Sequence, residues 1–308
     1  MALYEYVKQV QRFLRDTSEQ MVDYYDIVQY VNRARREIAL QTQCVRVNPP
    51  IQGQVASITI NSGGAGYSAN PTATISAPDS PSGLAGTPGG AQATISVGVV
   101  GGVITSAAVE YGGDGYFQPV ITITDPTGTG ASLTAVTTPI MTLNQNQETY
   151  AFSAIPLGNF PGVKEVFAVK SACVIYSNYR YMLRRYAFSE YQAKVRQYPH
   201  QYYYVPTICS QYGQGAGGTL YTYPIASQTY QFDLDCFCLP LDLTADGDPE
   251  AIPDPWTDAV PWYAAHLAYL ELQNLNAAKF YYDMYINMLH RYSSAARVGY
   301  ANNRYGRY

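Results

Sequence analysis

A duplicated glycine-tyrosine segment constrains the fold of this chain more than any other feature. The first copy, from Ile58 to Pro78, reads ITINSGGAGYSANPTATISAP, and the second, from Ala108 to Pro126, reads AVEYGGDGYFQPVITITDP. Glycine allows positive φ at tight turns, and the flanking β-branched residues favour extended, half-buried positions. The corresponding residues are Gly63 with Gly112, Gly64 with Gly113, Gly66 with Gly115, Tyr67 with Tyr116, Pro71 with Pro119, Thr74 with Thr122, Ile75 with Ile123 and Pro78 with Pro126.

Each copy continues into further strand-like sequence, ATISV after Gly90-Ala91 and SLTAV after Gly130-Ala131. One copy cannot cover its own apolar face, so the two copies are expected to pack as a small sandwich or barrel. Pro49-Pro50 and Pro139 bound this segment. We therefore predict an inserted β domain over residues 51–138, within a discontinuous host domain of residues 1–50 and 139–308.

Both ends of the chain show helical periodicity. Apolar residues recur at helical spacing over residues 2–15, and a second helix follows from Asp23, with Ile27, Val31, Ala34 and Ile38 on one face. Near the other end, a helix opens around Pro255 to Pro261, and a last helix spans residues 277–297. One-sided apolar stripes need a covering layer, so the two helix pairs are predicted to form a four-helix bundle.

Residues 142–241 alternate apolar and polar side chains, a strand pattern interrupted by one short helix that starts at Phe188. The predicted fold class is therefore α+β: a bundle of N- and C-terminal helices with antiparallel strands, plus the inserted all-β domain.

The composition favours a protein that binds other proteins. Charged residues make up only 14% of the chain, whereas tyrosine contributes 31 of its 308 residues. Tyrosine is enriched where surfaces are buried against partners, although a tyrosine-rich core is the alternative. The N-terminus lacks a signal-peptide pattern, and no apolar run is long enough for a membrane span. We expect a soluble protein that is made in the cytosol and has no membrane partner.

No catalytic constellation is convincing, so the chain is predicted not to be an enzyme and to carry no cofactor or metal. The three histidines are scattered, and the five cysteines fit buried, reduced thiols. The acidic stretch with Asp242, Asp246, Asp248, Glu250, Asp254 and Asp258 departs from a calcium-loop pattern, which favours a solvated loop over a metal site.

Two arginine-containing segments are candidate contacts with partners. On the second helix, Arg33, Arg35 and Arg36 are candidate subunit or partner contacts, with a solvated face and nucleic-acid contact as alternatives. Residues 293–308 are predicted to be a flexible tail that folds on docking, with an inert terminus and nucleic-acid stacking as alternatives. The candidate docking residues in and beside this tail are Arg291, Tyr292, Arg297, Tyr300, Arg304, Tyr305, Arg307 and Tyr308.

Three segments resemble the head-to-tail adaptor (connector) proteins of tailed bacteriophages. The opening helices carry VQRFLRD and YVNRARREIA, the middle carries GVKEVFAVKSACVIYSNYRYMLRRYAFSEYQAKVR, and the later block is DPEAIPDPWTDAVPWYAAHLAYLELQN. Ala187 stands where the family pattern LRxxSF has serine, and the β insertion departs from the compact adaptor pattern.

The resemblance implies a structural virion protein at the head-tail interface, assembled in the host cytoplasm. It implies a ring, commonly of twelve copies, that joins the portal protein to a tail or nozzle protein, while DNA passes through without sequence recognition. The C-terminal tail would dock on the portal, and the β domain would decorate the ring or receive tail fibres. The alternatives are a glycan-binding or cell-wall-degrading virion protein and a capsid decoration protein.

Overall fold

The computed structural model describes residues 2–16, 20–79, 89–158, 160–176, 179–197 and 204–296. The chain divides into two compact units. Unit 1 comprises Met1–Val47, Asn159–Phe167 and Phe237–Tyr308, and unit 2 comprises Asn48–Gly158 and Ala168–Cys236. Helices and many antiparallel strands together confirm the predicted α+β class.

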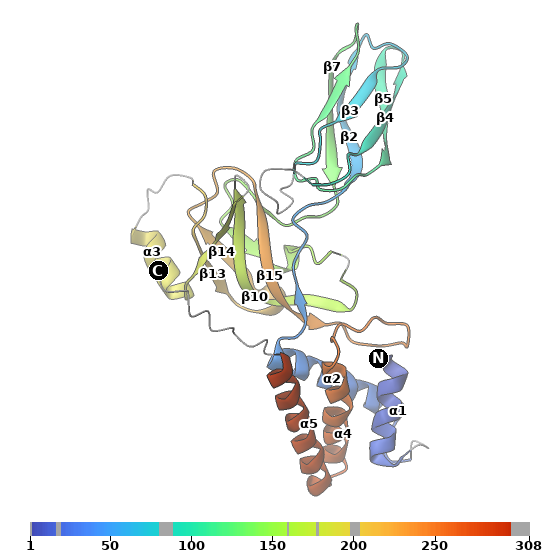
Figure 1. The fold of residues 1–308 in the computed structure, drawn as a ribbon, viewed down its shortest axis with the longest axis vertical. Coiled ribbons are helices and arrows are strands. Elements are labelled where there is room, and N and C mark those ends of the chain that lie inside the picture. The colour runs from blue at the N-terminus through green and yellow to red at the C-terminus, as the bar shows by residue number, and fades with distance from the viewer. Residues whose placement is uncertain are drawn as a thin grey trace. The chain divides into compact units, whose positions relative to one another are not determined.

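Among its described residues, unit 1 contains four helices of more than ten residues, drawn in Figure 1: α1 (Leu3–Leu14), α2 (Tyr24–Thr42), α4 (Val260–Glu271) and α5 (Leu275–Ala296). All four were predicted within a few residues of their observed bounds, except that a short 3-10 helix, η3 (Trp256–Ala259), precedes α4. Helix α4 contacts each of the other three helices. The alanines of its small face, among them Ala264, Ala265 and Ala268, are fully buried because small side chains permit close helix packing.

Aromatic side chains bind the C-terminal end of α1. The hydroxyls of Tyr269 on α4 and Tyr281 on α5 both donate to the backbone oxygen of Phe13, at 3.0 Å each. The ring of Phe13 packs 4.5 Å from that of Trp262 and 5.5 Å from that of Tyr281. A helix leaves its last carbonyls without intrahelical donors, so these two tyrosines satisfy a group that would otherwise need water.

Unit 2 contains most of the strands, whereas β1 (Arg46–Val47) lies in unit 1, and β10 (Val163–Tyr176) and β15 (Tyr230–Pro240) continue from unit 2 into unit 1. One sheet has the order β1-β15-β10-β11 with β8 beside β15, and another has the order β12-β13-β14-β9. The short helix α3 (Phe188–Gln197) starts at the predicted residue. The strands are β1 (Arg46–Val47), β8 (Thr142–Leu143), β9 (Thr149–Ala151), β10 (Val163–Tyr176), β11 (Tyr179–Met182), β12 (Arg184–Arg185), β13 (Ile208–Tyr212), β14 (Thr219–Tyr223) and β15 (Tyr230–Pro240), with 3-10 turns η1 (Phe152–Ala154) and η2 (Gly215–Gly217).

In the duplicated segment, every strand pairs with a strand from the other copy. The first copy forms β2 (Val55–Ala65), β3 (Thr72–Ile75) and β4 (Thr94–Val100); the second forms β5 (Val103–Tyr111), β6 (Ile121–Thr124) and β7 (Thr129–Thr137). The antiparallel pairs are β2 with β7, β3 with β6, and β4 with β5. Further contacts of β2 with β5, β3 with β4 and β6 with β7 connect the three ribbons in a closed cycle. Neither copy therefore forms its strand pairs alone.

The repeated tyrosine explains why the glycines accompany it. Tyr116 is fully buried, and its hydroxyl accepts the N–H of Ala93 at 2.8 Å and donates to the oxygen of Ser76 at 3.0 Å. Its counterpart Tyr67 accepts the N–H of Ala131 at 3.1 Å. Each tyrosine thus binds the backbone of the other copy. The glycines leave room for these contacts, since a Cβ on Gly113 would lie 2.5 Å from the oxygen of Ala91.

A small apolar core lies between the ribbons. Val55, Ile75, Ala93 and Tyr116 are buried together, with four partly buried apolar residues around them. Strand burial alternates along β6 and along most of β5 and β7, as the β-strand pattern of their sequence predicted. The predicted boundaries at residues 51 and 138 stay a prediction, because these residues belong to the same compact unit as the other strands of unit 2.

Replacing Gly113 by alanine should destabilise the strand pairs of the duplicated segment more than replacing Gly101 by alanine. Gly113 and Gly101 have nearly the same positive φ, 63° and 61°, but a Cβ on Gly101 meets nothing within 4 Å. Gly101→Ala should cost only the left-handed backbone penalty of about 1–2 kcal/mol, whereas Gly113→Ala adds overpacking of about 1–3 kcal/mol. The hydrogen-exchange protection of the amides in β4 and β5 measures the loss of stability in each variant. Equal losses in the two variants would contradict the packing role of Gly113.

Candidate interaction surfaces

The centre of unit 1 is a buried ion pair between Arg35 and Glu250. The Arg35 side chain is 0% exposed and that of Glu250 is 9% exposed, with Nη2 2.7 Å from Oε1. Nε donates to both carboxylate oxygens, at 3.1 and 3.0 Å, so the contact is bidentate. A charge removed from water in this way is tolerated only when its hydrogen-bonding groups find partners.

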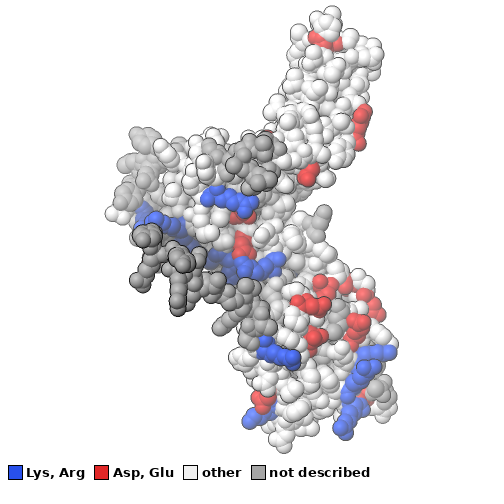
Figure 2. All heavy atoms as spheres, viewed as in Figure 1, with Lys and Arg blue, Asp and Glu red and all other residues white. Residues whose placement is uncertain are grey.

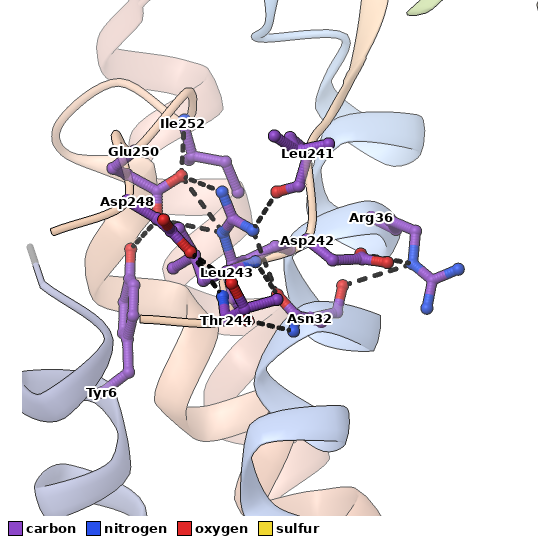
Figure 3. A network of polar contacts seen from close by, with 11 residues as sticks. Tyr6, Asn32, Arg36, Leu241, Asp242, Leu243, Thr244, Asp248, Glu250 and Ile252 are labelled. Carbon is purple, nitrogen blue, oxygen red and sulfur yellow. Dashed lines mark hydrogen bonds and ion pairs between the residues drawn. The ribbon is translucent and has the colours of Figure 1, made fainter. Parts of the chain in front are cut away.

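The other hydrogen-bonding groups of Arg35 and Glu250 have partners on α1, on α2 and on the acidic loop, as Figure 3 shows. Tyr6 of α1 donates its hydroxyl to Glu250 at 2.9 Å, and the N–H of Ile252 donates to the same carboxylate at 2.9 Å. Arg35 donates through Nη1 to the oxygen of Leu241 at 2.7 Å and to Asn32 at 3.2 Å. Burial, followed by the Glu250 charge and hydrogen bond, raises the pKa of Tyr6 far above its usual value.

The network fixes the acidic loop on the helices. The Asn32 amide accepts the N–H of Leu243 at 2.8 Å and donates to its oxygen at 2.9 Å, as in a strand pair. Within the loop, Asp248 accepts the backbone N–H groups of Thr244 and Ala245. The loop from Leu241 to Ile252 is therefore held from two sides, and Glu250 is not the solvated acid that the sequence predicted.

The three arginines predicted to contact a partner differ in position. Arg35 is internal and ion-paired, so in this fold it stabilises the loop and presents no surface, which corrects its predicted role. Arg33 is exposed, and Arg36 is 46% exposed with Nε 3.7 Å from Asp242. The sequence already indicated that Arg35 is buried, because position 35 lies four residues after the buried Val31 and therefore on the apolar face of the helix.

Beside this loop, helix α2 borders a surface hollow of about 460 Å³. Arg33 and Arg36 line it together with Tyr24, Tyr25 and the loop residue Thr244. Exposed tyrosines next to guanidinium groups are typical of surfaces that bind proteins. Arg33 and Arg36 therefore stay candidate contacts with a partner.

Of the predicted docking residues near the C-terminus, Arg291 and Tyr292 are described, on α5. Tyr292 packs edge-on to Trp256 at 6.0 Å, and its hydroxyl donates to Asp258 at 3.3 Å. Tyr292 thus has a role within unit 1. The other predicted residues lie outside the described residues: Arg297, Tyr300, Arg304, Tyr305, Arg307 and Tyr308.

Unit 2 carries a second exposed aromatic surface, which the sequence analysis did not single out. Strand β11 is the last strand of its sheet and is exposed at all four positions. A hollow of about 570 Å³ lies beside it, lined by Tyr176, Tyr181, Met182, Arg184, Tyr204 and Pro206, among others. Met182 is 68% exposed and Tyr204 is 69% exposed, which is unusual for large apolar side chains.

The described residues contain no group of three or more His, Cys, Asp or Glu side chains that could hold a metal ion. Among the helices of the described chain, none has the length and apolar character to span a membrane. None of the five cysteines forms a disulfide, and Cys236 and Cys238 are buried on the same face of β15.

Removing the Glu250 charge should destabilise unit 1 strongly. Glu250→Gln leaves a buried guanidinium without its counterion, which typically costs about 3–5 kcal/mol. The matched control is Asp242→Asn, because the Asp242–Arg36 contact is exposed and should contribute less than about 1 kcal/mol. The fluorescence of Trp256 and Trp262 during urea unfolding reports on this unit; similar losses in both variants would contradict the assigned role of the buried pair.

The buried thiols should resist alkylation in the folded protein. Burial raises the pKa of Cys209 to about 11 and that of Cys238 to about 12, so little thiolate is present at pH 8. Iodoacetamide should therefore modify the half-buried Cys44 and Cys173 first, and Cys209 and Cys238 only after unfolding. Mass spectrometry of timed samples checks the order; equally fast labelling of Cys238 and Cys44 would contradict it.

A model of the SU10 adaptor protein family matches residues 124–306, more than half of the chain. The match begins at the end of β6 and continues through α4 and α5, so it includes the ion-pairing Glu250 but not Arg35. No curated protein matches the chain. Because the match covers more than half of the chain, the chain belongs to the SU10 adaptor protein family, whose name indicates a structural adaptor protein of a bacteriophage.

Proposed function

We propose that this protein forms a ring at the head-tail interface of a tailed bacteriophage, joining the portal vertex of the head to the tail. The observation that carries the proposal is the family match over residues 124–306. In this role the protein catalyses no reaction. Its function is to offer binding surfaces of fixed shape to several neighbours at once.

Two structural properties support a binding role. The acidic loop is held on the helices of unit 1 by a bidentate ion pair and its hydrogen bonds, so the surface beside it is preorganised. Large aromatic residues are exposed in both units, among them Tyr25 in unit 1 and Tyr179 in unit 2. A chain with several separate aromatic surfaces suits an assembly in which each copy contacts more than one partner.

The proposed arrangement places the portal contact in the C-terminal residues, which follow α5 and are rich in arginine and tyrosine. Arginine and tyrosine dominate the energetics of many protein interfaces. The duplicated segment would form a β domain inserted into a host built on the four helices, and it would bind a tail component or fibre. DNA would pass through the ring without being read in sequence.

The portal contact can be tested with a chain that ends at Ala296. The truncated protein keeps α5 and every contact described for unit 1, so it should fold as the full chain does. We expect it to lose binding to the portal protein of the same phage in size-exclusion chromatography, with particles that package DNA but carry no tail. Tight portal binding by the truncated protein would contradict the proposed docking segment.

A charge control separates specific docking from general attraction. Replacing Arg297, Arg304 and Arg307 by lysine keeps the charge but removes the planar guanidinium. If these arginines bind carboxylates in bidentate contacts, the lysine variant should bind the portal much less tightly than the full chain. Absence of the protein from purified virions would overturn the whole proposal, whatever the truncated chain does.

A further inference from the structure

The ring that we propose needs two different complementary surfaces on one chain, because a head-to-tail contact joins unlike patches. We propose that the hollow beside β11 of one copy receives the proline-bearing acidic loop of the next copy, at Pro253, Asp254 and Pro255. This inference rests on the proposed function and identifies a contact within the ring. It combines a receptor in unit 2 with a ligand segment in unit 1.

The receptor is apolar, aromatic and basic. Tyr176, Tyr181 and Tyr204 supply rings around the hollow, and Arg184 is the one charged residue that lines it among the described residues. The adjacent Arg180 on β11 is also exposed, with Nη1 3.3 Å from Asp233. A hollow of about 570 Å³ can take a short peptide segment, and its tyrosines offer flat apolar faces with polar tips.

The edge position of β11 strengthens this interpretation. Among the described strands, β11 pairs with β10 on one side and ends the sheet on the other, so its outer backbone groups face away from the sheet. Natural proteins usually protect such edges, yet this one presents Tyr179, Tyr181 and Met182 to solvent. An exposed edge strand that carries large apolar side chains beside one charged residue is expected where another chain binds.

The ligand segment is acidic, rich in proline and already ordered. Pro249, Pro253 and Pro255 are exposed, and so are Asp246 and Asp254. Proline rings can pack on aromatic faces, and the turn in which the N–H of Trp256 donates to the Pro253 oxygen at 3.0 Å leaves the backbone little freedom to lose on binding. Asp254 and Asp246 are also anchored, since Oδ1 of Asp254 accepts the Thr257 hydroxyl at 2.6 Å and Asp246 accepts the N–H of Tyr4 at 2.7 Å.

Complementary charge favours the contact between the acidic loop and the hollow beside β11. Figure 2 shows acidic side chains gathered on the visible face of unit 1, while on unit 2 Lys and Arg form a band with a few acidic side chains beside it. The loop presents carboxylates, and the hollow presents the guanidinium of Arg184 with no carboxylate among its lining residues. A carboxylate such as Asp254 would form a charge-assisted contact with Arg184, while the prolines cover the tyrosines.

Charge reversal on the full chain tests the contact. Arg184→Glu and Asp254→Arg should each weaken self-association by about tenfold or more in sedimentation velocity, because like charges would face each other. The double variant Arg184→Glu/Asp254→Arg should recover assembly. Arg196→Glu on α3 and Asp283→Arg on α5 are matched controls with the same charge changes at exposed positions away from the contact, and both should assemble as the unchanged chain does.

A photocrosslink identifies the occupant. A benzophenone amino acid replaces Tyr181 in an equal mixture of ¹⁴N- and ¹⁵N-labelled chains, which is irradiated both alone and assembled on the portal. Crosslinks between light and heavy chains at residues 249–256 are expected. Crosslinks to the same chain, to another segment or to the portal protein would each overturn this contact, as would absence of a crosslink.

The two proposals fail in different ways. Rings that assemble equally well from Arg184→Glu chains would overturn the contact and leave the adaptor function intact. A chain that self-associates neither in solution nor on the portal would overturn both.

Discussion

The buried guanidinium of Arg35 determines the conformation of unit 1 around it. Its three nitrogens donate to Glu250, Asn32 and the Leu241 backbone, and this arrangement joins α2 to a loop more than 200 residues later in the chain. Tyr6 adds α1 to the same carboxylate. An uncompensated charge at this position would cost several kcal/mol, so the loop has one conformation in which every group is paired.

The duplicated segment is stabilised in a different way. Each strand of one copy pairs with a strand of the other copy. Each copy also contains a tyrosine whose hydroxyl hydrogen-bonds to the backbone of the other copy. Duplication therefore produces one closed core in place of two separate ones. The glycines serve this geometry, since at Gly64 and Gly113 the backbone has positive φ and lies too close to the opposite copy for any side chain.

Tyrosine has two separate functions in this protein. Some tyrosines are buried and bind main-chain or acidic groups, such as Tyr116 and Tyr191, and burial raises the pKa of Tyr191. Others, such as Tyr25 and Tyr204, are exposed beside hollows. The abundance of tyrosine in the sequence is thus explained partly by the core and partly by surfaces that suit an adaptor.

Local patterns in the sequence determined the elements: the helix bounds near Leu3 and Tyr24, the helix that starts at Phe188, and the turns of the duplicated segment. These follow from apolar periodicity and glycine, which act over a few residues. Strand partners and the partner of Arg35 depend on contacts between distant parts of the chain, and no local pattern encodes them. Only the tertiary structure decided that Arg35 is internal, that the copies interleave, and that an aromatic hollow lies beside β11, because each depends on which segments pack together.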